Sequence, residues 1–294
     1  MDKFLAVIKK LLTLFVKLFT GVCYLVLLFF FVQVFCYTSF RIPSESMEPV
    51  LVNGDYILVN KMIKGARLFD VFAAVEGKDV DIYRIPGFGD FKRNDVLVFN
   101  FPYPENRWDS ISMDVMRYYV KRCIALPGDT LEIREGRYKV RGCGERLGNQ
   151  DERYIEKLEH AEQYGIAVDA FPYDEQQGWT VCEFGPLAIP EKGRKVVMNR
   201  TNFFLYRQLI DWEQKKKLSL KDGRILLGDS AITQYRFEKD YYFVAGDNMA
   251  NSQDSRYWGM LPEEYIVGKV VRIWYSEDKY SGKIRWERIL KKVR

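Results

Sequence analysis

Two serines one residue apart, Ser44 and Ser46, lie in a short segment that two prolines restrain. Residues 41–50 read RIPSESMEPV. Proline fixes its own backbone angle φ and disfavours helix for the residue before it, so the segment is expected to be extended or turning. Ser46 would then be presented as a nucleophile from a stiff loop, although serine is also an ordinary turn residue. The segment alone leaves both interpretations open.

A serine nucleophile needs a base, because its hydroxyl is weakly nucleophilic at neutral pH. The chain has one histidine, His160, in a predicted polar helix where a solvated or packed histidine is expected. The remaining candidates for the base are a carboxylate and a neutral lysine. Lys121 is the best candidate, because it lies in the strand-like run RYYVKRCIAL at 117–126, and burial beside apolar groups lowers the pKa of a lysine. The alternative is a strand lysine that faces solvent.

Composition excludes several classes of function. The 294 residues include 45 Lys and Arg against 40 Asp and Glu, a net charge of +5 without a long basic run, so no nucleic-acid partner is expected. None of the five cysteines forms a C-x-x-C pair, and we expect no metal and no cofactor. Cys143 and Cys182 could form a disulfide in an extracytoplasmic region or remain free thiols.

The elements that must position these residues begin with a membrane anchor. Residues 18–37 read LFTGVCYLVLLFFFVQVFCY without a charge, and such a run at ~1.5 Å per residue spans the ~30 Å of a bilayer core. A cleaved signal peptide is the alternative, but the run is long and lacks an A-x-A-like site. Lysines in the basic segment 1–17, with only Arg41 close behind the run, predict a cytoplasmic N-terminus.

Past the anchor the pattern is that of short strands separated by turns, as at 56–59, 96–99, 130–133, 241–245 and 266–274. The middle differs, because 151–164 and 202–217 have apolar residues at helical spacing. We therefore expect one N-terminal transmembrane helix and a mainly β domain. The β domain would comprise 38–140 and 239–294, the latter ending in a basic tail, with a mixed α/β insert over 141–238.

Four segments resemble bacterial type I signal peptidases, the membrane-anchored Ser/Lys endopeptidases that remove signal peptides from exported proteins. Residues 43–49 are similar to the family's P-S-x-S-M-x-P box and 54–61 to the strand that follows it. Residues 119–129 resemble the lysine box, and 246–259 resemble the last box. One departure is Met249-Ala250, where the family commonly has a charged pair, so an ion pair within that loop is not expected.

The resemblance implies a signal-peptidase-like β fold and a role for each matching residue. Ser46 would be the nucleophile and Lys121 the general base. The Ser46 amide and the Ser44 hydroxyl would hold the oxyanion, and Ser252 would orient the Lys121 ammonium. Asp254 and Arg256 would form a supporting ion pair.

The resemblance also implies partners and a location. Substrates would be preproteins with signal peptides, cleaved after small residues at the outer face of the cytoplasmic (inner) membrane by a single-pass protein, with the secretion translocon nearby. Two alternatives stay open. One is a specialised Ser/Lys peptidase that processes a single surface or conjugation substrate, suggested only by Met249-Ala250. The other is an inactive anchored scaffold that binds signal peptides, which should have lost Ser46 or Lys121.

Overall fold

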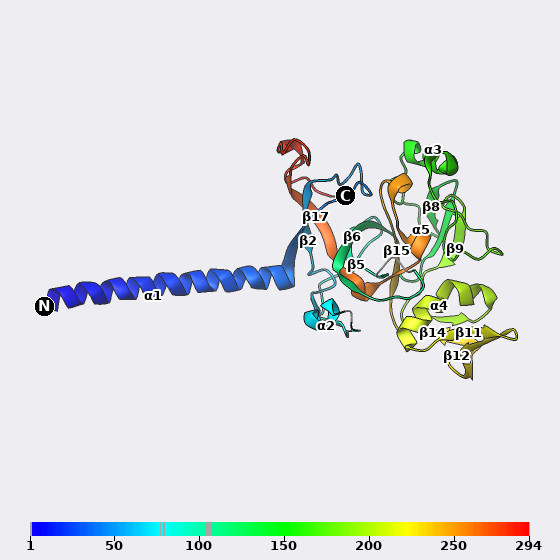
Figure 1. Ribbon diagram of the computed structural model, residues 1–294, viewed down its shortest axis with the longest axis horizontal. Coiled ribbons are helices and arrows are strands. Elements are labelled where there is room, and N and C mark those ends of the chain that lie inside the picture. The colour runs from blue at the N-terminus through cyan, green and yellow to red at the C-terminus, as the bar shows by residue number, and fades with distance from the viewer. Residues whose placement is uncertain (1, 77, 79, 104–107, 294) are drawn as a thin grey trace.

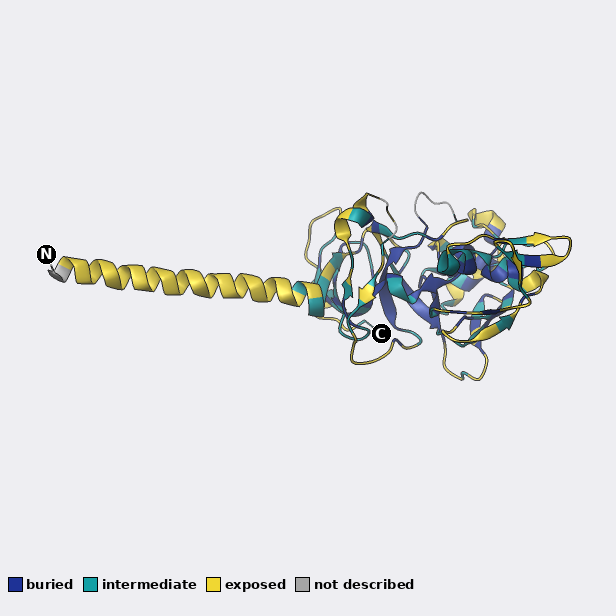
Figure 2. Ribbon diagram, turned by 90° about the horizontal axis from the view of Figure 1, so that it is seen from below, coloured by how far each residue is buried: buried dark blue, intermediate teal, exposed yellow. Residues whose placement is uncertain are grey.

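The computed structural model describes residues 2–76, 78, 80–103 and 108–293. One long helix, α1 (Asp2–Phe31), extends away from a β-rich body, and its side chains are exposed from Phe4 to Phe31 (Figures 1 and 2). In the described part of the chain, one segment is long and apolar enough to cross a membrane, Phe4–Cys36, with a mean hydropathy of 2.4. It includes all of the run predicted at 18–37 except Tyr37, which begins the first strand.

Seven strands form the main antiparallel sheet, in the order β1-β2-β17-β5-β6-β15-β16. Their bounds are β1 (Tyr37–Arg41), β2 (Asp55–Asn60), β5 (Val96–Phe101), β6 (Asp114–Ala125), β15 (Tyr241–Ala245), β16 (Leu261–Pro262) and β17 (Ile266–Ser276). β6, which carries Lys121, lies between β5 and β15. The predicted architecture, an apolar N-terminal helix followed by a mainly β domain, is confirmed.

The anchor is joined to the sheet by hydrogen bonds at the end of the helix. A π-helical turn (Val32–Cys36) leads from α1 into β1. The Lys61 ammonium donates to the Gln33 carbonyl at 2.7 Å and to the Val34 carbonyl at 3.3 Å, while the Lys61 amide donates to the Cys36 carbonyl at 2.9 Å. Carbonyls at a helix end lack intrahelical partners, and a lysine that binds them links the anchor to the strand after it.

Residues 141–238 form the part of the body farthest from α1 (Figure 1). Its helices are α3 (Glu152–Glu159), followed by a 3-10 turn (Ala161–Tyr164), and α4 (Arg200–Gln214), close to the two predicted helices. α4 begins at Arg200 because the Asn199 side chain caps it by accepting from the Asn202 amide. α4 ends where Lys215 takes a left-handed conformation.

Small sheets connect this region to the main domain. β7 (Thr130–Arg134) pairs with β8 (Arg137–Val140) on one side and with β9 (Phe184–Ala188) on the other, so strands on both sides of residue 141 share a sheet. The remaining strands are β3 (Arg67–Leu68), β4 (Tyr83–Arg84), β10 (Lys195–Val197), β11 (Leu218–Lys221), β12 (Arg224–Leu227), β13 (Ser230–Ala231) and β14 (Gln234–Arg236). Two short helices complete the body, α2 (Val71–Val75) and α5 (Ser255–Trp258).

Residues 42–54, which we call the serine loop, connect β1 to β2 and rest on an apolar cluster of their own. Ile42, Met47 and Leu51 are buried in this cluster, together with residues of β2, β5 and β17. The base of the loop is closed by two backbone hydrogen bonds, from the Ile42 amide to the Asp55 carbonyl at 2.8 Å and from the Gly54 amide to the Ile42 carbonyl at 3.0 Å. The loop containing Ser46 is therefore packed at its centre and closed at its base.

A buried carboxylate ties the end of the serine loop to the C-terminal segment. Asp55 is fully buried and accepts from the Val52 amide at 2.9 Å and the Ser276 hydroxyl at 2.7 Å. Arg288 donates to both Asp55 oxygens, at 2.9 and 2.6 Å, and also to the Val50 carbonyl at 2.9 Å. Removal of the carboxylate would leave a largely buried guanidinium without its counter-charge.

We predict that Asp55→Ala lowers the free energy of unfolding of the body by about 3 kcal/mol, because breaking a buried ion pair strands the remaining charge. Urea unfolding in detergent measures this change. The control is Glu76→Ala, which removes an exposed ion pair with Lys78 and should cost less than about 1 kcal/mol. Equal effects of the two substitutions would contradict the role assigned to Asp55.

Candidate active site

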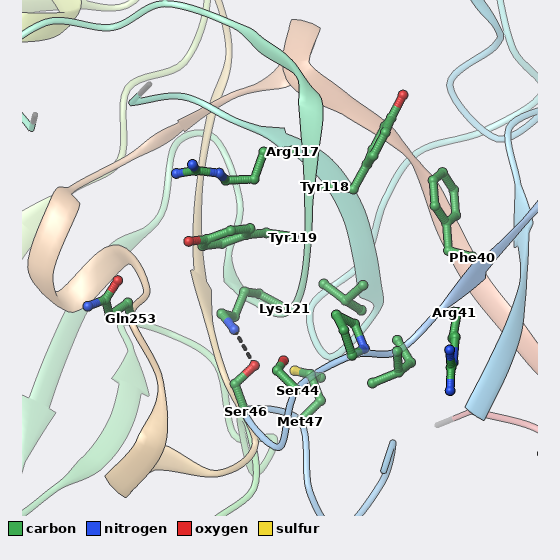
Figure 3. A pocket seen from close by; sticks show the side chains of 13 residues that line it. Phe40, Arg41, Ser44, Ser46, Met47, Arg117, Tyr118, Tyr119, Lys121 and Gln253 are labelled. Atoms are coloured by element: carbon green, nitrogen blue, oxygen red, sulfur yellow. Dashed lines mark hydrogen bonds between the residues drawn. The ribbon is translucent and has the colours of Figure 1, made fainter. Parts of the chain in front are cut away.

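The structure brings the two principal predicted residues, Ser46 and Lys121, into direct contact. The Lys121 Nζ donates to the Ser46 Oγ at 2.6 Å across 75 positions of sequence (Figure 3). Ser46 comes from the serine loop and Lys121 from β6, where it lies opposite Leu97 of β5. This is the contact expected between a nucleophile and the base that takes its proton.

Lys121 is held in a dry environment. The residue is only 4% exposed, and the Tyr119 ring lies with its centroid 5.6 Å from Nζ. Burial disfavours the ammonium and lowers the pKa of Lys121 from its ordinary 10.5 to about 8. The charges of Asp254 and Asp247 act against this shift, and that of Arg256 adds to it. The amine can therefore lose its proton near neutral pH.

Ser252 lies beside Ser46, with Gly246 between them. A Cβ added to Gly246 would lie 2.2 Å from the Ser252 Oγ and 2.5 Å from the Ser46 carbonyl oxygen, so only glycine fits there. The Asn248 amide donates to the same Ser46 carbonyl at 3.1 Å. The buried Ser252 Oγ has no hydrogen-bond partner within the described residues, so its predicted contact with Lys121 is not formed in this state.

Asp254 and Arg256 form a completely buried ion pair with an N–O distance of 2.9 Å. Burial raises the pKa of the Asp254 carboxyl, but the Arg256 charge and hydrogen bonds outweigh it and hold that pKa below its ordinary value. Asp254 also accepts from the Gly246 amide at 2.9 Å, and Arg256 donates to the Met249 carbonyl at 2.9 Å. The pair thus holds both sides of the loop next to Ser46.

The loop around Met249 and Ala250 is held without a charged pair at these two positions. Met249 is buried and begins a 3-10 turn, Met249–Asn251, in which the Asn251 amide donates to the Asn248 carbonyl at 3.0 Å. Apolar packing and hydrogen bonds to main-chain carbonyls fix the loop in place of the missing ion pair.

A second buried ion pair was not assigned from the sequence. The Arg122 guanidinium donates to both oxygens of Asp247, each at 2.6 Å, and to the Asn94 carbonyl at 2.7 Å. Arg122 directly follows Lys121 in segment 119–129, and Asp247 directly follows Gly246 in segment 246–259. The available signal was therefore two opposite charges, one in β6 and one two residues after β15, 125 positions apart.

A cavity of about 540 Å³ opens beside the side chains of Ser46 and Lys121. Ser44, Ser46 and Lys121 line it, with Pro43, Met47, Tyr119 and Val120 among the other lining residues. Figure 3 shows Phe40 and Arg41 on one side of Ser46 and Lys121 and Gln253 on the other. An extended chain can lie in such a cavity with one of its carbonyls next to Ser46.

His160 and the cysteines take no part in this arrangement. His160 ends α3, and all five cysteines are free, including Cys143 and Cys182. Among the described residues, no three His, Cys, Asp or Glu side chains are grouped as metal ligands would be.

Known proteins resemble this chain over most of its length. The family model for signal peptidase, peptidase S26, matches residues 15–275. A signal peptidase I from Pseudomonas fluorescens is 30% identical over 285 residues, which cover 93% of this chain and 76% of the relative. The enzyme of the same name from Pseudomonas aeruginosa is 30% identical over 294 residues, with the same two coverages.

A crystal structure of a signal peptidase I from Enterococcus faecalis aligns with 62% of this chain and 98% of that chain, at 20% identity. Its TM-score of 0.27 is too low for an element-by-element comparison. The match to the family model and the likeness to the two Pseudomonas relatives show that the chain belongs to the signal peptidase family, peptidase S26.

Proposed function

We propose that this member of a serine endopeptidase family cleaves signal peptides from preproteins with Ser46 as nucleophile and Lys121 as general base. The observation that carries the proposal is the 2.6 Å contact between the Ser46 hydroxyl and a lysine amine that burial keeps easily deprotonated. An inactive scaffold would have no need to keep a lysine buried against a serine, because desolvating an ammonium is costly.

The reaction follows from these positions. Neutral Lys121 takes the Ser46 proton as Ser46 Oγ bonds to the scissile carbonyl carbon, and the carbonyl oxygen becomes an oxyanion. Lys121 then gives the proton to the departing amine as the C–N bond breaks, leaving an ester on Ser46. A water that Lys121 deprotonates attacks this ester, and Lys121 returns that proton to Ser46 Oγ as the C–O bond breaks. The new carboxyl group is released and loses its remaining proton to solvent.

We assign supporting roles in this reaction to Ser44 and Ser252. The Ser46 amide and the Ser44 hydroxyl hold the oxyanion, and a well-aimed donor of this kind is worth about 3 kcal/mol. The presence of Ser44 in the same cavity supports its assignment. Ser252 offers a buried, unpartnered oxygen beside Ser46, available to accept from Lys121 once the lysine is protonated.

The position of the site suits substrates that lie in a membrane. β1 follows the apolar helix directly, and Ser46 comes five residues after the end of β1. We propose a cytoplasmic N-terminus and a body outside the cytoplasmic membrane, supported by the lysines in the first half of α1, before the uncharged run 18–37. The cleavage site of a membrane-inserted signal peptide would then reach Ser46, and the translocon that delivers preproteins would lie nearby.

We predict that Ser46→Ala and Lys121→Met each lower kcat/KM for a preprotein with a small-x-small site by at least about a thousandfold, because nucleophile and base act as a unit. Cleavage is followed by gel electrophoresis with purified protein in detergent. The exposed residues Ser230 and Lys139 provide matched controls, and Ser230→Ala and Lys139→Met should leave the rate unchanged. Undiminished cleavage by either active-site variant would contradict the mechanism.

The pH dependence gives a second prediction. Because Lys121 must be neutral to act as a base, kcat/KM should rise with pH through its lowered pKa of about 8 and level off above it. The measurement is the initial rate on a fixed peptide between pH 6 and 10. A flat profile, or a rise centred on the ordinary lysine pKa of 10.5, would count against this role.

Asp254→Asn should move that profile to lower pH. The Asp254 charge raises the pKa of Lys121, and its loss leaves the Arg256 charge, which lowers that pKa, without a counter-charge. Both changes lower the pKa of Lys121. The same rate measurements test it, with Asp278→Asn, in the turn after β17, as the control. An unchanged or raised apparent pKa would show that Asp254 does not act on Lys121.

A further inference from the structure

A second cavity, of about 870 Å³, lies next to the active site. One wall comes from the loop 248–253 and from Glu45, which directly precedes Ser46. The other wall comes from the insert, chiefly residues 164–169 with Lys157 and Tyr173. Gln253 lines both this cavity and the first one, so the two are neighbours.

The first cavity contains Ser46 and Lys121, and the second cavity adjoins it on the side of Gln253. The first extends to Phe40 and Arg41 of β1, the strand that follows the anchor, and Figure 3 shows Gln253 on the other side of Ser46 and Lys121. Beyond Gln253 the second cavity continues to the insert, the part of the body farthest from α1 (Figure 1). An extended chain that passes Ser46 from the anchor side would therefore enter the second cavity.

We propose that this second cavity binds the segment of the substrate that follows the scissile bond, with Tyr164 and Tyr173 of the insert as its principal contacts. The inference rests on the proposed function. The signal peptide is held at the membrane and occupies the cavity next to β1, so the first residues of the mature protein lie in the cavity formed with the insert. The insert thereby takes part in substrate selection.

The side chains of the second cavity suit a peptide. Tyr164 is 55% exposed and Tyr173 is 53% exposed, and neither hydroxyl has a hydrogen-bond partner in the described part of the chain. Aromatic rings offer large contact areas at a low cost in conformational entropy, and their hydroxyls can bond peptide groups. The side-chain amides of Asn251 and Gln253 make no hydrogen bonds to other described residues either, and each can both donate and accept.

The charges around the second cavity also favour a neutral, extended occupant. Lys157 carries a positive charge there, with its ammonium 5.7 Å from the Tyr164 ring centroid, while Glu45 and Asp169 carry negative charges. A strongly anionic or cationic ligand would meet a like charge on one side. A polypeptide backbone, which is uncharged and both donates and accepts hydrogen bonds, meets no such repulsion.

The test compares two peptides that share the same residues before the scissile bond. The short peptide ends one residue after the bond, and the long peptide continues for six residues. Wild-type protein in detergent should cleave the long peptide with the higher kcat/KM, and adding residues one at a time should raise kcat/KM stepwise before it levels off. Cleavage of neither peptide would refute the proposed function itself. Equal kcat/KM for all lengths would refute only the second cavity as a binding site.

Substitutions in the second cavity test whether Tyr164 and Tyr173 cause the effect of peptide length on kcat/KM. Tyr164→Ala and Tyr173→Ala should each lower kcat/KM for the long peptide by about fivefold or more, the size expected of an interface aromatic, and leave the short peptide unchanged. The matched control is Tyr280→Ala, because Tyr280 is 91% exposed in a turn after β17. A proportionate loss on both peptides, or no loss on the long one, would overturn the assignment. The length series on wild-type protein tests the cavity without relying on a variant that folds.

Discussion

The desolvation of one amine is the constraint on which the rest of the site depends. Lys121 can act on Ser46 only if it is neutral, and in water a lysine amine carries a proton at neutral pH. The sheet solves this by placing Lys121 on β6, opposite β5 and below the Tyr119 ring, where it is 4% exposed. Any change that admits water to this position would restore the ammonium and return Ser46 to an ordinary loop serine.

Two buried ion pairs fix the geometry around Lys121. The Asp254–Arg256 and Arg122–Asp247 pairs bring two carboxylates that raise the pKa of Lys121, while the Arg256 guanidinium lowers it. Both pairs also bind main-chain atoms, including the Gly246 amide, which fixes the loop where Gly246 separates Ser46 from Ser252. Such pairs are costly to bury, and their value here lies in fixing geometry rather than in adding stability.

The sequence was sufficient to predict the anchor, the β domain and the segments that carry Ser46 and Lys121, because apolar length, turn punctuation and local motifs are short-range signals. It did not identify the contact between Arg122 and Asp247, because no short segment of the sequence indicates that β6 and β15 are neighbours. The unpartnered state of the Ser252 hydroxyl and the position of Tyr173 in the second cavity depend on long-range packing of the loop 248–253 and of residues 141–238. The spacing of the motifs does not predict that packing.

The central claim, that Lys121 is a base because it is buried, is tested most directly by titrating its amine. Lysine labelled with 13C at Cε can be followed by NMR across pH in the Ser46→Ala protein, with the Lys121 signal identified by its absence in a Lys121→Arg variant. We expect that signal to titrate near pH 8, well below the other lysines. A Lys121 signal that titrates at the ordinary value of 10.5 would contradict the account.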